Sequence, residues 1–145
     1  MKLVENGALE FLTKEISEMR ERLLTVGYEM FSWQTQLREL RTLKFITQRQ
    51  RGTTYLAVKL LEHFADSVLF CRSVTSAEHA KSLVGPCSLA KNILVVSTTD
   101  WYTGVERPRI VITDGVDPIN YVALNKFIIR HCKDDFILVM LGQGV

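Results

Sequence analysis

The 145-residue sequence contains no long apolar run. A membrane-spanning helix needs about 18 or more consecutive apolar residues, and no stretch of this chain approaches that length. The N-terminal segment carries Glu5 and Glu10 and lacks the apolar centre of a secretory signal peptide. We therefore expect a cytoplasmic protein with no membrane partner, in the host cytoplasm if the source is viral.

Cysteine and net charge are also low. The three cysteines, Cys71, Cys87 and Cys132, form an odd set without a C-x-x-C pair, which is typical of reduced, buried thiols rather than a disulfide framework. The three histidines are far apart and show no metal-ligand spacing. A net charge of +2 is too small to indicate nucleic-acid binding by itself.

The composition that remains is that of an ordinary globular domain, with 47% hydrophobic and 23% charged residues. No repeat, low-complexity tract or internal linker interrupts it. The length predicts one domain over residues 1–145, with an N-terminal helix in residues 1–27 and a core in residues 28–145.

Five apolar segments alternate with helical patterns along the core. This alternation predicts an α/β fold with a mainly parallel five-stranded sheet flanked by helices. Strands are expected at residues 43–47, 67–72, 92–97, 109–114 and 136–141, and helices at 7–26, within 28–43, and at 54–64, 77–84 and 117–131. Ligands of such sheets bind beyond the carboxyl ends of the strands, where this chain carries Thr47, Arg72, Ser97, Asp114 and Gly142.

The expected N-terminal helix has a narrow apolar seam. Asn6 can cap it and Gly27 follows its end. The seam consists of Leu9, Leu12, Ile16, Met19 and Leu23. We favour packing of this seam on the helix's own domain, and the alternative is docking of a partner protein or a second copy of the chain.

Residues 43–56 have the order of a phosphate-binding loop: an apolar strand, a polar loop and a Gly-Thr-Thr step into a helix. Against the pattern G-x-x-x-x-G-K-[ST], Thr47 and Gly52 stand at the glycines and Thr54 at the Ser/Thr. Thr53 stands at the lysine. We expect nucleotide phosphates at residues 48–54, with the site formed by Thr47, Gln48, Arg49, Gln50, Arg51, Gly52, Thr53 and Thr54.

Asp114 ends an apolar strand downstream of this loop. An acid in this position commonly holds Mg²⁺ opposite the Ser/Thr of the loop, so we expect Thr54 and Asp114 to be the metal-linked pair. The alternative is a carboxylate that caps a nearby turn. Asp117, followed by Pro118, is first of all a helix cap.

An aromatic segment with a glutamine, Phe31-Ser32-Trp33-Gln34, precedes the loop. The Gln34 amide has the donor and acceptor that an adenine edge requires. Two interpretations stay open: an adenine pocket formed by these residues, or aromatic core residues with Gln34 exposed.

The order of these segments resembles a known family. Residues 31–34, Arg49-Gln50-Arg51-Gly52-Thr53-Thr54, residues 110–117 and Gly142-Gln143-Gly144 are similar to motifs of the first RecA-like ATPase domain of superfamily 2 helicases. The ATPase domain of phage large terminases, the DNA-packaging motors, is the nearest resemblance, and it covers roughly residues 31–145. It implies ATP and Mg²⁺ as ligands, DNA as a partner, and Asp114 and Asp117 as catalytic acids.

Two positions depart from that family. Thr53 replaces the loop lysine, and Gly115 replaces the glutamate that activates water. Arg49 or Arg51 can supply part of the missing charge. We therefore expect poor hydrolysis, and the alternative function is an inactive relative that serves as a protein- or DNA-binding module.

A last candidate is the segment with Trp101, Tyr102, Arg107 and Arg109. Aromatic rings and arginines together favour stacking with single-stranded nucleic acid. An ordinary exposed loop is the simpler interpretation.

Overall fold

The computed structural model describes residues 7–45, 52–97, 106–116 and 122–142. Its centre is a five-stranded sheet in the order β1-β5-β4-β2-β3, and all neighbouring strands are parallel. The strands are β1 (Thr42–Phe45), β2 (Ser67–Cys71), β3 (Ile93–Val95), β4 (Ile110–Asp114) and β5 (Ile137–Leu141). The predicted α/β fold with a five-stranded parallel sheet is thus confirmed.

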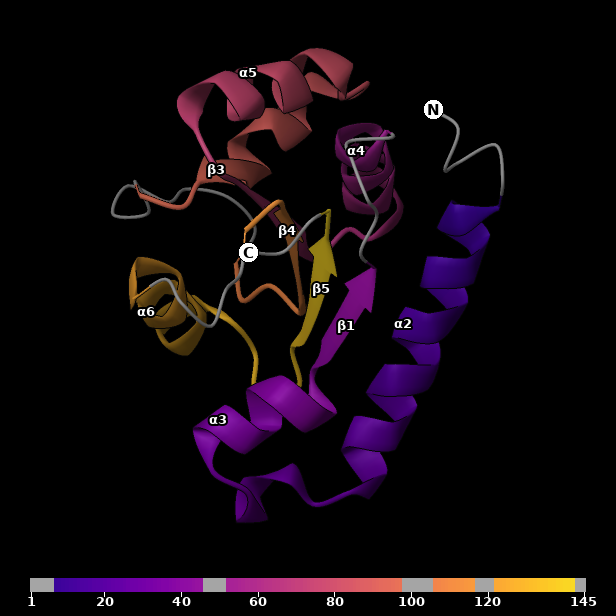
Figure 1. The fold of residues 1–145 in the computed structure, drawn as a ribbon, viewed down its shortest axis with the longest axis vertical. Helices are drawn as coiled ribbons and strands as arrows, with labels where there is room; N and C mark the ends of the chain where they lie inside the picture. The colour runs from indigo at the N-terminus through magenta and orange to yellow at the C-terminus, as the bar shows by residue number, and fades with distance from the viewer. Residues whose placement is uncertain (1–6, 46–51, 98–105, 117–121, 143–145) are drawn as a thin grey trace.

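Helices cover both faces of this sheet (Figure 1). On one face, α2 (Ala8–Thr25), α4 (Thr53–His63) and α5 (Val74–Leu83) pack against residues such as Leu69, Ile112 and Val139. On the other face, α6 (Val122–His131) packs against Val68 and Val111. Strands buried on both faces read as continuous apolar runs, which is why the central strands were recognisable in the sequence.

The connections that follow β1 and β4 lie on opposite faces of the sheet. After β1 the chain runs through α4 to β2, and after β4 it runs through α6, on the opposite face, to β5. Connections of this kind diverge at a switch point, where a crevice opens beyond the carboxyl ends of the strands. Here a pocket lies at the carboxyl end of the sheet, beyond the ends of β2, β4 and β5.

Helix α2 packs on the domain itself, as the favoured interpretation predicted. Its seam residues Leu12 and Ile16 are 1% and 0% exposed, and the helix contacts α4, β5 and β1. These residues are therefore not available to a partner. The N-cap is Gly7 in a left-handed conformation (φ 83), whereas the expected cap, Asn6, lies outside the described residues.

The helix expected within residues 28–43 is present only in part: a helical segment runs without a break from Trp33 to Leu40 and ends just before β1, but it is shorter and less regular than expected. The structure has a 3₁₀ turn at Tyr28–Met30, the short helix α3 at Trp33–Thr35 and a π-helical turn at Gln36–Leu40. Ser32 caps α3 by accepting a hydrogen bond from the Thr35 N–H (3.2 Å), and such a cap favours a new helix start. The π turn closes with Arg41 N donating to the Gln36 carbonyl (2.9 Å).

Among the described residues, no helix has the length and apolar character needed to cross a membrane. The expected start of α6 at Asp117 and Pro118 lies outside the described residues.

Candidate functional site

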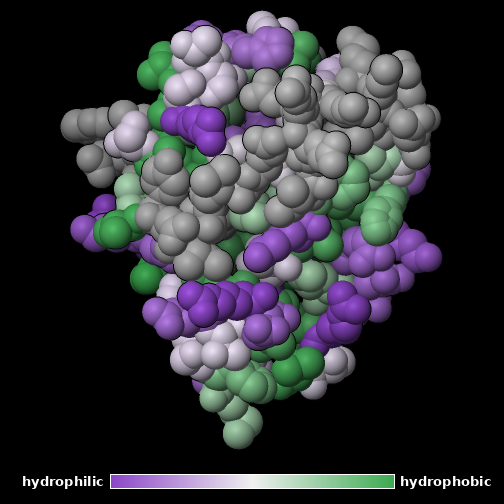
Figure 2. Space-filling model, in the orientation of Figure 1, coloured by the Kyte–Doolittle hydropathy of each residue, from purple (hydrophilic) through white to green (hydrophobic). Residues whose placement is uncertain are grey.

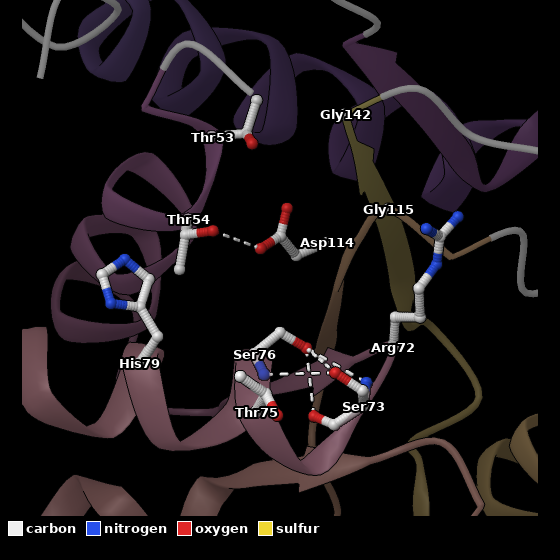
Figure 3. Close-up of a pocket in the computed structure, with 10 residues that line it drawn as sticks. All are labelled: Thr53, Thr54, Arg72, Ser73, Thr75, Ser76, His79, Asp114, Gly115 and Gly142. Carbon is white, nitrogen blue, oxygen red and sulfur yellow. Dashed lines mark hydrogen bonds between the residues drawn. The ribbon is translucent and has the colours of Figure 1, made fainter. Parts of the chain in front are cut away.

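A pocket of ≈ 380 Å³ lies at the carboxyl end of the sheet, in the crevice at the switch point (Figure 3). It brings together residues from the start of α4, from the end of β2 and the first half of α5, and from the ends of β4 and β5. The lining residues are Thr53, Thr54, Arg72, Ser73, Thr75, Ser76, His79, Asp114, Gly115 and Gly142.

Two residues that the sequence predicted to act together are in direct contact in this pocket. The Thr54 hydroxyl donates a hydrogen bond of 2.7 Å to Oδ2 of Asp114. Thr54 lies in the first turn of α4 and Asp114 is the last residue of β4. The bond, which Figure 3 shows across the pocket, therefore joins two parts of the chain that are 60 residues apart.

The amino end of α4 is suited to an anion. The first bond of the helix runs from Leu56 N to the Gly52 carbonyl (2.9 Å), so the N–H groups of residues 53–55 have no acceptor within the helix. Such groups and the helix dipole together favour negative charge. In addition, the Thr53 hydroxyl is buried without a hydrogen-bond partner among the described residues.

Two glycines form the floor of the pocket. Gly115 N donates to the Leu141 carbonyl (2.9 Å) and Gly142 N to the Phe45 carbonyl (3.2 Å), which aligns the ends of β4, β5 and β1. Both glycines have positive φ, 70° and 87°. A Cβ on Gly142 would lie 3.2 Å from Gly115 N, which is tighter than most Cβ contacts, so a side chain here would require the neighbouring backbone to shift.

The residues on the β2–α5 side of the pocket were not predicted from the sequence to be site residues, although Arg72 was expected at the carboxyl end of a strand. Helix α5 begins at Val74, three residues before the expected start, because Ser73 is its cap. Ser73 Oγ accepts from Ser76 N (3.2 Å), and Ser73 N donates to Ser76 Oγ (3.0 Å). The spacing of these two serines is that of a capping box, and it was the signal available in the sequence.

The charge around the pocket is modest. Arg72 and His79 are exposed at its rim. Cys71, paired with Asp114 in the sheet register, is buried, and burial together with the Asp114 charge raises the pKa of its thiol to about 12. Cys71 therefore stays a neutral thiol and is not a nucleophile.

No protein-family model matches this chain, and no curated protein sequence matches it. Inferences about function therefore start from the pocket itself. It combines helix N–H groups that have no acceptor within α4 with one carboxylate and one hydroxyl close together.

The structure does not bring Gln34 to this pocket. Gln34 is exposed on α3, which lies near the beginnings of β1 and β5, at the other end of the sheet (Figure 1). Trp33 is half-buried there, and its ring contacts that of Phe136 (centroids 5.7 Å apart). This placement agrees with the alternative, in which Trp33 packs on the domain and Gln34 is exposed, although Phe31 is exposed as well.

The remaining predicted site residues fall into two groups. Gly52 is the N-cap of α4, with φ 81, directly before Thr53. The others, Thr47, Gln48, Arg49, Gln50, Arg51 and Asp117, lie outside the described residues.

The suggested nucleic-acid patch is only partly described. Arg107 is exposed, but Arg109 lies at the beginning of β4, near Asp66 (4.0 Å) and Asp135 (3.8 Å). These acids neutralise Arg109 in part, which reduces its value for a phosphate. Trp101 and Tyr102 lie outside the described residues.

Proposed function

We propose that this domain binds a nucleoside triphosphate, ATP, together with Mg²⁺ in the pocket at the end of β4. The observation that carries the proposal is the 2.7 Å contact between Thr54 Oγ1 and Asp114 Oδ2. In phosphate-loop ATPases a Ser/Thr at the start of the helix and an acid at the end of a strand hold the metal ion from two sides. The same two residue types meet here at the same kinds of position.

The residues of the pocket fit this ion. Mg²⁺ is usually held by one or two carboxylates, with waters and substrate phosphates completing its coordination. The described residues contain no group of three or more His, Cys, Asp or Glu side chains that could hold a metal. Thr54 and Asp114 would hold the ion, which would offset the negative charge of the phosphates.

The chain's own groups have separate tasks in this proposal. The free N–H groups at the start of α4 bind phosphate oxygens, and the buried Thr53 hydroxyl supplies a further donor. Gly115 and Gly142 keep the floor free of side chains, so that a ligand can approach the backbone. Arg72 at the rim adds positive charge toward the outer phosphates.

The wider role follows from the family resemblance. We infer the ATPase-type domain of a DNA-packaging or helicase-like motor, with DNA as the partner. The alternative, an inactive relative that acts as a protein- or DNA-binding module, is favoured by Thr53 and Gly115, which replace the loop lysine and the catalytic glutamate.

A matched pair of variants at Thr54 tests the proposal. We expect Thr54→Ala to weaken Mg²⁺-dependent ATP binding about tenfold or more, as for loss of a hydrogen bond or ligand to a charged group. Thr54→Ser, which keeps the hydroxyl, should bind as the wild type does. Isothermal titration calorimetry measures both, and ATP binding that is unaffected in Thr54→Ala would contradict the proposal.

A further inference from the structure

A second pocket, of ≈ 630 Å³, lies at the opposite end of the sheet and has no part in the proposed function. It is bounded by the segment between α2 and β1 and by the end of α6. Tyr28, Trp33, Arg41, Ile128 and Phe136 are among its lining residues. Its volume is in the range of small-molecule sites, about 300–1,000 Å³.

The unusual member of this pocket is Arg41. It is 2% exposed, and its guanidinium lies 4.5 Å from the Tyr28 ring centre and 4.4 Å from that of Phe136. Nε donates to Gln36 Oε1 (3.0 Å), and Nη1 donates to the Phe136 carbonyl (3.0 Å). The guanidinium is therefore held in one place by two rings and two hydrogen bonds.

Arg41 forms no ion pair in the part of the chain that the structure describes, and the acceptors of these two hydrogen bonds are neutral oxygens. Burial lowers the pKa of Arg41, while Tyr28 and the charges of Asp134 and Asp135 oppose this shift, and an arginine stays charged at neutral pH. Asp134 and Asp135 thus act on Arg41 from a distance but do not form an ion pair with it. A buried charge without a paired counter-charge is costly. The rings offset part of that cost, and an anionic ligand would offset more.

The mouth of the pocket limits the charge of such a ligand. Glu29 and Asp134 are exposed there, and Lys133 is half-buried. Two acids at the mouth disfavour a ligand with several negative charges, whereas one guanidinium suits a single carboxylate. In the view of Figure 2, the surface in the region where Figure 1 places α3 mixes hydrophobic and hydrophilic residues, which favours a small ligand over a large apolar partner.

We propose that this second pocket binds a small aromatic carboxylate, whose ring packs on Trp33, Ile128 and Phe136 and whose carboxylate pairs with Arg41. In this proposal Trp33, from the aromatic segment before the phosphate loop, belongs to a binding site that is separate from the ATP site. This inference does not depend on the proposed ATP site, because the two pockets share no lining residue.

The test compares two probes that differ in charge, indole-3-acetate and its neutral amide, indole-3-acetamide. Binding is followed by NMR through the indole N–H of Trp33, which donates to Asn125 Oδ1 (3.4 Å) and is assigned with Trp33→Phe. We expect saturable binding of the acid, about tenfold or more tighter than the amide. Equal binding of the two probes to the wild type, or binding of neither, overturns the proposal.

A variant of Arg41 tests whether its charge accounts for the preference for the acid over the amide. Arg41→Met removes the charge at similar volume, a replacement that buried ionic sites often tolerate, and it should bind both probes with the same weak affinity. A preference for the acid that survives in Arg41→Met also overturns the proposal. Thr54→Ala, in the other pocket, is the matched control and should keep the wild-type preference; if Arg41→Met fails to fold, the probe comparison on the wild type still decides.

Discussion

At the residue scale, Gly142 is the position that ties the fold to the candidate site. Glycine is favoured at this position for two separate reasons. Its φ is 87°, and an added Cβ would lie 3.2 Å from Gly115 N. The first concerns only the backbone, and the second concerns the approach of β5 to β4 directly under Asp114.

These two reasons can be separated by measurement. Gly27→Ala has the positive φ (60°) but no atom within 4 Å of the added Cβ, so we expect it to cost about 1–2 kcal/mol. Gly142→Ala should cost more, about 2–4 kcal/mol, because a close contact is added to a strained backbone. Urea unfolding measures both free energies, and equal costs would show that the close approach does not matter.

Some residues of the site could be predicted from the sequence, and others could not. Thr54 and Asp114 could be predicted because motif position and strand ends are local patterns, and the structure brings the two side chains together. The spacing of Ser73 and Ser76 could have shown where α5 begins, but it could not show that Ser73 and His79 line a pocket, because which side chains near the start of α5 face a pocket depends on how β2 and β4 pair. One of the two open interpretations placed Gln34 beside a nucleotide because of its order in the chain, yet order does not say at which end of the sheet a residue lies.

At the scale of elements, α2 is a structural helix whose apolar seam belongs to the core. Leu12 is 1% exposed, whereas Leu24, in the same helix, is 66% exposed. The spacing of apolar residues identified the helix and its seam, but periodicity alone cannot distinguish a core-facing seam from a docking seam.

Two alanine variants in α2 distinguish them. We expect Leu12→Ala to lower the free energy of unfolding by about 2–5 kcal/mol, because it leaves a cavity in the core. Leu24→Ala should change it by about 0.5 kcal/mol or less, as for exposed positions. Chemical denaturation followed by circular dichroism tests this. If Leu12→Ala unfolds with the stability of the wild type, the seam is not part of the core, and the docking interpretation is favoured instead.

The segment between α2 and β1 shows why one regular helix was expected and a shorter, irregular helical segment was found. Its apolar residues have helical spacing, but Ser32 caps a new start and the chain must reach the buried position of Arg41 before β1. These tertiary requirements override local propensity.

At the scale of the whole molecule, the order of the elements was readable because each central strand is a continuous apolar run. The number of strands and their parallel direction followed from this pattern. The strand order β1-β5-β4-β2-β3 did not, since it depends on the faces that α4 and α6 cover. That order places α4 beside Asp114 and so creates the site.

The whole chain is expected to hydrolyse ATP poorly. Thr53 cannot neutralise the outermost phosphate, and Gly115 cannot orient water. Loss of one such group typically costs about a hundredfold or more in rate, so turnover should fall far below the usual enzyme range of about 1–1,000 per second. A steady-state phosphate-release assay, with and without DNA, measures it; turnover of about 1 per second or faster that is lost in Asp114→Ala would contradict this expectation.

The most direct test of the central claim is a calorimetric titration of the wild-type chain with ATP, in Mg²⁺ and then in excess chelator, with AMP as the matched ligand that lacks the outer phosphates. If α4, Thr54 and Asp114 form a triphosphate–metal site, ATP binds saturably at one site per chain, more weakly without Mg²⁺, and AMP binds more weakly than ATP. ATP binding that is absent with Mg²⁺, or that is equal for ATP and AMP and unchanged by the chelator, would show that this pocket is not a nucleotide site.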